Sequence, residues 1–225
     1  MADFFEVVKT RRSVRRYTGD PVSDADIQKV LEAGRWAPTG ANTQPCEFIV
    51  VRDKGLLESI AILVIADRER MAAYDTRFAG RRVDYLKTIS AMIVVCADPR
   101  FKEFYPLGAG REAILHLSVG AVVENMFLAI TALRLGTAWI SIRDGSEREL
   151  RELLDIPSDM EVHVVMPLGH PGVEDKQRFR REQSEVVHQD RYDTSKRVPD
   201  AVLAEAVSAK EKRLQYRLKG PRSFR

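Results

Sequence analysis

The chain has 225 residues, of which 44% are hydrophobic and 31% charged, a composition typical of globular proteins. Its formal net charge of +3 is too small to indicate a nucleic-acid-binding protein, although residues 176–225 contain 14 Lys/Arg against 7 Asp/Glu. Cys46 and Cys96 lie far apart without a C-x-x-C motif, so the sequence indicates neither a disulfide framework nor a zinc site. The N-terminus lacks the features of a signal peptide, so we expect a cytoplasmic protein.

One stretch near the N-terminus combines many cations with a hydroxyl group. Residues 11–17 contain four arginines together with Ser13. Arginine carries a fixed charge and a planar fork of donors, which suits phosphate oxygens and planar anionic rings. A second stretch, residues 37–45, is turn-rich and carries Asn42 and Gln44, whose amides can reach ligand heteroatoms. The two stretches indicate a site for one anionic, planar ligand; the alternative is a solvated basic patch followed by an ordinary loop.

The first half of the chain predicts helices and strands. A first helix would use Phe4, Phe5 and Val8 as its apolar face, and a second would begin with Ser23 as its N-cap. Residues 67–84 are charged with scattered aromatics, which suits either a lid over a site or a solvated helix pair. We expect helices over residues 2–10, 24–36 and 56–66, and strands over residues 46–51 and 91–96.

The longest helical pattern, residues 111–134, is apolar on most sides. Such a helix is buried in a core or an interface, or it spans a membrane. His116, Glu124 and Arg134 argue against a membrane, so we expect a large domain core or a homodimer interface. Residues 108–113 fit G-x-G-x-x-A, but no strand precedes them directly, so we do not interpret them as a dinucleotide site.

The second half continues the alternation. We expect strands over residues 137–142 and 161–168 and a short helix that starts with Ser146 in a capping box. A helix over residues 199–218 has a weak apolar stripe and would be stable only when packed on another surface, such as a partner subunit. Helices interleaved with strands around one long helix indicate an α+β or α/β layered fold.

No motif for a catalytic nucleophile, a metal site or a P-loop stands out. Cys46 lies in an expected strand, where a small buried hydrophobe is the commoner role. The four histidines, His116, His163, His170 and His188, are isolated from each other, so we interpret each as structural. The usable chemistry is cationic and hydrogen-bonding, which suits a site whose reaction belongs to a bound cofactor.

Three motifs follow one another along the chain, in the order and at the spacing found in one protein family. They are Arg11-Arg12-Ser13-x-Arg15, Ala37-Pro38-Thr39-Gly40-x-Asn42-x-Gln44-Pro45 and Gly136-Thr137-Ala138-Trp139-Ile140-Ser141. The late segments Gly169-His170-Pro171 and Glu185-Val186-Val187-His188 complete the pattern. Together these motifs resemble the flavin-dependent nitroreductase family over residues 4–192.

The resemblance implies an α+β, three-layer fold whose central, mostly antiparallel sheet is flanked by helices, with the long helix at a homodimer interface. It implies FMN as the cofactor and NADH or NADPH as the electron donor. A hydride would pass through flavin N5 to a small electrophilic acceptor, such as a nitroaromatic compound or a quinone, in a ping-pong reaction. Each active site would use both chains of the homodimer, and no membrane is implied.

The resemblance also assigns residues to FMN by their position in the motifs. The phosphate, ribityl chain and pyrimidine edge would be contacted by Arg11, Arg12, Ser13 and Arg15, and Arg15 is our candidate for stabilising the reduced flavin. The other subunit would contribute Pro38, Thr39, Gly40 and Asn42, with Gln44 in the same loop. The N5/O4 edge would be lined by Ile140 and Ser141. A late basic pair would clasp the phosphate, either Arg178 and Arg180 in an ungapped alignment or Lys176 and Arg178.

Two residues depart from the family pattern: Cys46 stands where many relatives have an aromatic residue, and Ser141 where glycine is common. Residues 1–192 would form the FMN-binding domain and residues 193–225 a basic helical arm on the partner subunit. Two other functions remain: a specialised relative (reductive dehalogenation, dehydrogenation or flavin breakdown), or a non-enzymatic binder using the basic tail for nucleic acid. The low net charge and the lack of interleaved aromatics count against nucleic acid.

Overall fold

The computed structural model describes residues 3–74, 83–104, 111–142, 144–173 and 180–203. The chain divides into two compact units, residues 1–175 and residues 176–225. The helices and strands of the first unit are α1 (Phe4–Thr10), α2 (Asp24–Arg35), η1 (Gly40–Asn42), β1 (Cys46–Val51), α3 (Lys54–Tyr74), η3 (Asp84–Thr88), β2 (Ala91–Ala97), η4 (Pro99–Phe104), α4 (Arg111–Ala132), β3 (Gly136–Thr137), α5 (Asp144–Leu153) and β4 (Glu161–Gly169). The expected domain limits, residues 1–192 and 193–225, stay a prediction.

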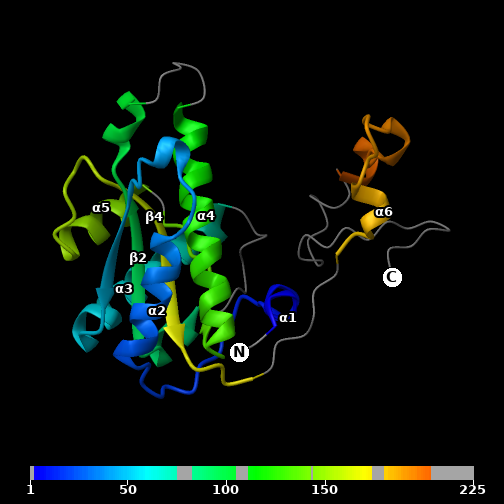
Figure 1. The fold of residues 1–225 in the computed structure, drawn as a ribbon. Helices are drawn as coiled ribbons and strands as arrows, with labels where there is room; N and C mark the ends of the chain where they lie inside the picture. Colours follow the sequence, from blue (N-terminus) through cyan, green and yellow to red (C-terminus); the bar gives the residue numbers. More distant parts are fainter. Residues whose placement is uncertain (1–2, 75–82, 105–110, 143, 174–179, 204–225) are drawn as a thin grey trace. The chain divides into compact units, whose positions relative to one another are not determined.

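The first unit is organised around a four-stranded antiparallel sheet in the order β1-β2-β4-β3 (Figure 1). The central strand β2 pairs with β1, where Cys46 lies opposite Ala97, and with β4, where Ala91 lies opposite Leu168. All seven residues of β2 are buried, because helices cover both faces of the sheet. The predicted strands over residues 46–51, 91–96 and 161–168 are confirmed.

The sheet is the middle of three layers, and each face carries its own apolar core. Ile93 and Val95 of β2 point into one core, together with residues of α2 and α4. Met92 and Val94 point into the other core, together with residues of α3, η3 and α5. This alternation follows from the two-residue period of a strand. The predicted α+β, three-layer architecture is therefore confirmed.

The contact between α2 and α4 depends on one glycine. Ser23 caps α2 as predicted, since its Oγ accepts a hydrogen bond from the Asp26 N–H at 3.1 Å. Val30 of α2 is buried, and one turn further on Gly34 faces α4. A Cβ at Gly34 would lie 2.8 Å from Cγ of Met126, so the close approach of the two helices requires glycine there.

The helix α4 is apolar on most sides, as predicted, and by length and composition it could cross a membrane. In the structure it packs on α2 and on the sheet, and Leu115, Val123 and Met126 are fully buried. It is therefore a core helix. One large apolar side chain of this helix, Leu117, is 73% exposed.

Three predictions are wrong in detail. The strand expected over residues 137–142 pairs with β4 only through Gly136–Thr137, and Ile140 rejoins β4 by an isolated bridge to Val165. The helix expected over residues 56–66 is part of the longer α3, so the charged region expected to be either a lid or a solvated helix pair is helical up to Tyr74, and residues 75–82 lie outside the described residues. In α1 the residue buried is Val7, and the predicted apolar face is exposed.

The predicted N-cap of α5 is also wrong. The helix begins at Asp144, and Ser146 lies inside it, fully buried. Its hydroxyl donates to Oδ1 of Asp67 at 3.2 Å and accepts a hydrogen bond from Arg70. The local sequence predicts that the Ser146 hydroxyl caps the start of a helix. In the structure the hydroxyl instead forms tertiary hydrogen bonds to α3.

The second unit contains α6 (Gln183–Val186) and η5 (Thr194–Lys196) within the described residues. Glu182 and Glu185 form a capping box at the start of α6. The rings of His188 and Tyr192 stack with their centroids 4.3 Å apart. The helix expected over residues 199–218 is described only to residue 203, where residues 200–203 are helical.

Candidate functional site

Residues 11–17, the arginine segment, are held along one edge of the sheet. The Val14 N–H donates to the Thr137 carbonyl at 2.8 Å, and Ser13 forms a parallel bridge with Thr137 of β3. Further along, the Gly172 N–H donates to the Arg16 carbonyl at 2.9 Å. The segment therefore runs as an irregular extra strand beside β3 and the end of β4.

Two buried side chains fix which way the arginine segment faces. Val14 and Tyr17 are buried, and the Tyr17 hydroxyl donates to the Val14 carbonyl at 2.9 Å. A Cβ at Gly136 would lie 2.8 Å from Val14, and a Cβ at Gly169 would lie 2.9 Å from the Tyr17 ring. Because these two residues point inward against glycines, the arginines between them point toward solvent or lie along the surface.

The three predicted arginines have different surroundings. Arg11 lies over the Phe127 ring of α4 at 5.7 Å, with its Nε 3.8 Å from a Glu124 oxygen. Arg12 donates from Nη1 to the carbonyls of Lys9 and Arg11, at 2.6 and 2.7 Å. Arg15 is exposed and donates from Nη1 to the Ser13 carbonyl at 3.2 Å. These guanidinium groups are thus held on one short segment, where their donors can meet an anion.

Tyr85 of η3 lies close to two residues of the arginine segment, Tyr17 and Arg15. Its ring centroid is 6.0 Å from that of Tyr17. Burial raises the pKa of the Tyr85 hydroxyl, and the positive charges of Arg15 and Arg68 oppose that rise. At neutral pH Tyr85 is therefore a neutral phenol beside Arg15.

Residues 38–44, the turn loop, are held by a strained backbone. Ala41, Asn42 and Gln44 all have positive φ, at 49°, 53° and 49°, a region that residues other than glycine rarely adopt. The Gln44 N–H donates to the Thr39 hydroxyl at 3.0 Å, and the Gly40 N–H donates to the Ser118 hydroxyl of α4, also at 3.0 Å. The loop therefore has a defined shape and one hydrogen bond that anchors it to α4.

Within one chain the turn loop and the arginine segment dock on different parts of α4. The loop is anchored at Ser118, whereas Arg11 contacts Glu124 and Phe127. Ser118 and Phe127 are separated by about 13 Å along the helix axis, given a rise of 1.5 Å per residue. The loop that carries Pro38, Thr39, Gly40, Asn42 and Gln44 is thus anchored on α4 about two turns away from the contacts of Arg11.

Ile140 and Ser141 follow β3, whose residue Thr137 pairs with Ser13. The Ile140 N–H donates to the Val165 carbonyl at 3.1 Å, so it is already used by β4. Ser141 is exposed, and its hydroxyl accepts a hydrogen bond from the Trp139 indole N–H at 3.2 Å. Ser141 is therefore the residue of this pair that can present its backbone N–H to a ligand.

The late basic pair belongs to the second unit. Arg180 is exposed and lies three residues before α6. Lys176 and Arg178 lie outside the described residues. The assignment of Arg178 and Arg180 to a phosphate stays a prediction.

Neither cysteine is suited to nucleophilic catalysis. Burial raises the pKa of the Cys46 thiol to about 12 and that of the Cys96 thiol to about 11. A thiol with such a pKa is almost entirely protonated at neutral pH, and the thiolate is the reactive form. Cys46 is half-buried and packs against the apolar core beneath α2 and α4, so it acts as a small apolar residue although it is not fully buried.

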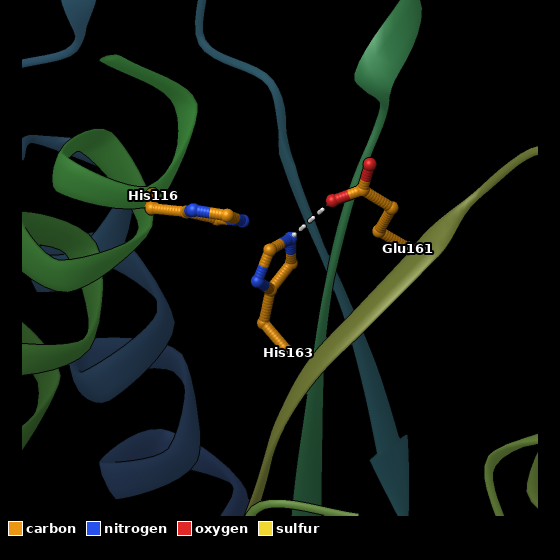
Figure 2. Close-up of side chains that lie close together, drawn as sticks. All are labelled: His116, Glu161 and His163. Atoms are coloured by element: carbon orange, nitrogen blue, oxygen red, sulfur yellow. Dashed lines mark ion pairs between the residues drawn. The ribbon is translucent and has the colours of Figure 1, made fainter. Parts of the chain in front are cut away.

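The interpretation of the histidines as isolated is wrong for two of them. His116 of α4 and His163 of β4 lie with ring centroids 5.4 Å apart, and Glu161 lies beside them (Figure 2). The sequence separation between the two histidines hides this pairing. One signal was available: Glu161 and His163 are two residues apart in a predicted strand, where alternate side chains share a face.

The sequence and the fold both match known proteins. The profile of the Nitroreductase family matches residues 8–170. A protein of Archaeoglobus fulgidus, named as a candidate NADH dehydrogenase/NAD(P)H nitroreductase, is 35% identical over 76% of this chain and 87% of its own length. Iodotyrosine deiodinase 1 of Rattus norvegicus is 27% identical over 76% of this chain and 62% of its own length.

A solved structure gives the same relationship. The crystal structure of a candidate nitroreductase from Desulfovibrio desulfuricans, in complex with FMN, is 28% identical. It covers 86% of this chain and 99% of its own, with a TM-score of 0.61.

Proposed function

This chain belongs to the nitroreductase family, and from that premise we propose that it is an FMN-dependent oxidoreductase that uses NADH or NADPH to reduce a small electrophilic acceptor. Two of the similar proteins support the proposal: the Archaeoglobus fulgidus relative, whose name includes NAD(P)H nitroreductase, and the Desulfovibrio desulfuricans protein, whose crystal structure contains FMN. The cytoplasm is the proposed compartment, because Cys46 and Cys96 are both free thiols.

The observation that carries this proposal is the arginine segment. Ser13 and Val14 are fixed to Thr137 by backbone contacts, so the segment keeps its shape without a ligand. Arg11, Arg12 and Arg15 then offer several N–H donors and fixed positive charge from one short stretch. This donor set fits a cofactor that carries a phosphate and a ring that becomes anionic on reduction.

The bound flavin would supply the redox chemistry, taking a hydride from the nicotinamide and passing it to the acceptor. The chain's own residues would bind and orient it. Arg11, Arg12 and Ser13 would hold the phosphate and ribityl groups, and Arg15 would provide positive charge that favours the reduced, anionic ring. Ser141 would present a backbone N–H to the ring edge, because the Ile140 N–H is used by Val165. No acid, base or nucleophile of the protein is required.

We propose that the site is completed by a second copy of the chain. The turn loop is anchored on α4 about 9–13 Å along the helix axis from the contacts of Arg11, and we propose that it meets the arginine segment of a partner rather than its own. Large apolar side chains near these regions are exposed, as expected for an interface: Phe4, Phe5, Trp36, Leu117 and Trp139. The basic arm of residues 193–225 would contact the same partner.

The homodimer can be tested with one substitution at its proposed interface. Leu117→Asp introduces a charge on an α4 position that is 73% exposed, so it should not disturb the fold of the single chain. We expect it to convert a dimer into a monomer in light scattering and to abolish FMN binding. A wild-type monomer that binds FMN would contradict the shared site.

The cofactor can be tested by absorption spectroscopy. We expect the purified protein, alone or after addition of FMN, to show a flavin band that NADH or NADPH bleaches under nitrogen. Arg11→Ala and Arg15→Ala should each weaken FMN binding about tenfold or more, since each removes a hydrogen bond to a charged group. The matched control is Arg148→Ala, because Arg148 lies exposed on α5 and should leave FMN binding unchanged. A wild-type protein that takes up no FMN would overturn the proposal.

The acceptor can be identified by turnover. The relative named iodotyrosine deiodinase 1 favours a second candidate, reductive dehalogenation of an iodinated aromatic compound. Parallel assays with a nitroaromatic compound, a quinone and iodotyrosine, each with NADH and with NADPH, would separate the two functions. We expect the nitroaromatic compound or the quinone to be reduced fastest.

A further inference from the structure

A cluster of metal-ligating groups lies where α4 meets the start of β4. His116 comes from α4, and Glu161 and His163 come from β4 (Figure 2). One possible ligand atom from each residue lies within 4.8 Å of the others. The His163 Nε2 is 3.2 Å from Oε2 of Glu161, and the ring of His116 points toward this pair (Figure 2).

A β-bulge brings Glu161 and His163 together on this side of the sheet. Val95 of β2 pairs with Val164, but the next residue, Cys96, pairs with Val162, so His163 is the extra residue of β4. Val164 packs in the core shared with α4, whereas Val162 packs against the opposite core. The bulge therefore shifts the alternation of β4 by one residue, and this turns Glu161 toward α4 together with His163.

The nitrogen of His163 that faces Glu161 has an unusual environment. It is shielded from solvent, and although Oε2 of Glu161 lies 3.2 Å away, the pair lacks the geometry of a hydrogen bond. A buried polar atom without a hydrogen-bond partner is rare and costly in native proteins. A metal ion would supply the partner that this nitrogen lacks.

The neighbours of the cluster hold its side chains in place. Nζ of Lys102 donates to Oε1 of Glu161 at 2.9 Å, which leaves Oε2 directed toward His163. Oε1 of Glu112 lies 3.3 Å from Nε2 of His116, and its other oxygen pairs with Lys102 at 2.5 Å. Ligating histidines and carboxylates commonly have such outer partners, which fix their orientation.

We propose that His116, His163 and Glu161 bind one divalent transition-metal ion, with Zn²⁺ as the best fit, and that this ion ties α4 to β4. Two imidazole nitrogens and one carboxylate oxygen are a donor set that zinc uses, with a fourth position for water. Magnesium and calcium prefer oxygen ligands and fit less well.

The cluster can close around such an ion with small movements. Tetrahedral zinc with bonds of about 2.0–2.1 Å places its ligand atoms about 3.4 Å apart. His163 and Glu161 are already at 3.2 Å, so His116 is the side chain that must move. It is half-exposed on the surface of α4 and can do so by changing its rotamer. The positive charge of Lys102 opposes a cation, so we expect micromolar rather than nanomolar affinity.

The test is a titration of the full-length chain, without a histidine tag and stripped with a chelator, followed by calorimetry and by thermal unfolding. We expect one Zn²⁺ per chain and a melting temperature that rises with zinc concentration, because the ion binds only the folded state. His116→Ala, His163→Ala and Glu161→Gln should each lower the affinity about tenfold or more. Co²⁺ should give the intense visible absorption of a tetrahedral site.

The matched control is His170→Ala, which removes a histidine outside the cluster, near the Pro21 carbonyl. It should bind zinc like the wild type. His116→Ala changes a half-exposed helix residue, so its far-UV circular dichroism should stay native even if His163→Ala unfolds the chain. The proposal is overturned if wild-type protein binds no stoichiometric zinc, if natively folded His116→Ala binds it as tightly as wild type, or if Co²⁺ shows only octahedral absorption.

Discussion

The arginine segment and the turn loop both present polar groups from short irregular stretches, yet they are held in opposite ways. The arginine segment has little local structure and depends on distant residues, since Gly136, Thr137 and Gly172 fix its backbone. The turn loop shapes itself through left-handed residues and local hydrogen bonds, and Ser118 anchors it to α4. The comparison teaches that an irregular segment can obtain a defined shape either from close packing against distant residues or from its own strained local backbone.

The largest effect should come from adding a methyl group at Gly136, which packs directly against Val14 of the arginine segment. A Cβ at Gly136 would lie 2.8 Å from three atoms of Val14, so Gly136→Ala must displace the segment. We expect it to lower the free energy of unfolding by about 3 kcal/mol, the upper part of the range for overpacking, and to abolish FMN binding. Chemical denaturation and flavin titration measure both effects.

The matched control for Gly136→Ala is Gly145→Ala in α5, where a Cβ would meet nothing within 4 Å. Because alanine favours helix over glycine, this variant should be as stable as wild type or up to about 1 kcal/mol more stable. Equal destabilisation by both substitutions would refute the close-packing explanation.

A smaller effect should follow from releasing the turn loop. Ser118→Ala leaves the Gly40 N–H without its acceptor and should lower the free energy of unfolding by about 1–2 kcal/mol. FMN affinity should fall as well if the loop completes a partner's site. The control is Thr131→Val, because the Thr131 hydroxyl, like that of Ser118, donates to a carbonyl four residues earlier but has no bond to a loop. If both variants lose the same stability, the anchor has no role.

Relieving the strain of the turn loop should change stability in the opposite direction. Ala41 has φ of 49°, and glycine adopts this region without steric cost. We expect Ala41→Gly to raise the free energy of unfolding by about 0.5 kcal/mol. Glycine relieves the backbone strain of the folded state, and the greater conformational entropy that it gives the unfolded chain offsets part of this gain. Ala33→Gly, in the helical backbone of α2, should instead lower it by about 1 kcal/mol. A loss at both positions would show that the loop is not strained at Ala41.

The smallest effect at neutral pH concerns Tyr85. Burial raises the pKa of the Tyr85 hydroxyl in the folded state. The folded protein therefore keeps this proton at a pH at which the unfolded chain, with the ordinary tyrosine pKa of about 10, releases it. The contribution of the neutral phenol is therefore complete below pH 10 and is lost as the pH rises above it. Tyr85→Phe should unfold like wild type at pH 7 and lose less stability between pH 9 and 11. Parallel pH profiles of the two proteins would contradict this assignment.

Local sequence patterns predicted the regular elements well. The spacing of Ser23, Ile27 and Val30 placed the cap and the buried face of α2, and the β-branched runs placed β1, β2 and β4. The same local rules failed where a distant partner competed. Ser146 looks like an N-cap but bonds to Asp67 and Arg70, and the predicted strand over residues 137–142 pairs for only two residues before it leaves the ladder.

The candidate site was predictable in its residue types but not in its arrangement. The arginines and the Asn/Gln loop stand out in the sequence, because their chemistry and turn signals are local properties. Which of them lie together depends on where each segment docks on α4, because Arg11 contacts Glu124 and Phe127 whereas Gly40 bonds to Ser118. The sequence also gave no reason to single out Ser141 over Ile140, whose N–H is used by Val165.

By itself the sequence determined the family, the layered α+β class and the cationic character of the site, because motifs, periodicity and charge are carried by neighbouring residues. Only the tertiary structure decided that Val14 and Tyr17 turn the arginines outward, and that a bulge at His163 brings it and Glu161 to His116. These outcomes depend on close approaches between residues far apart in the chain. A one-residue shift in strand register reverses which side chains face each other, and no local pattern records such a shift.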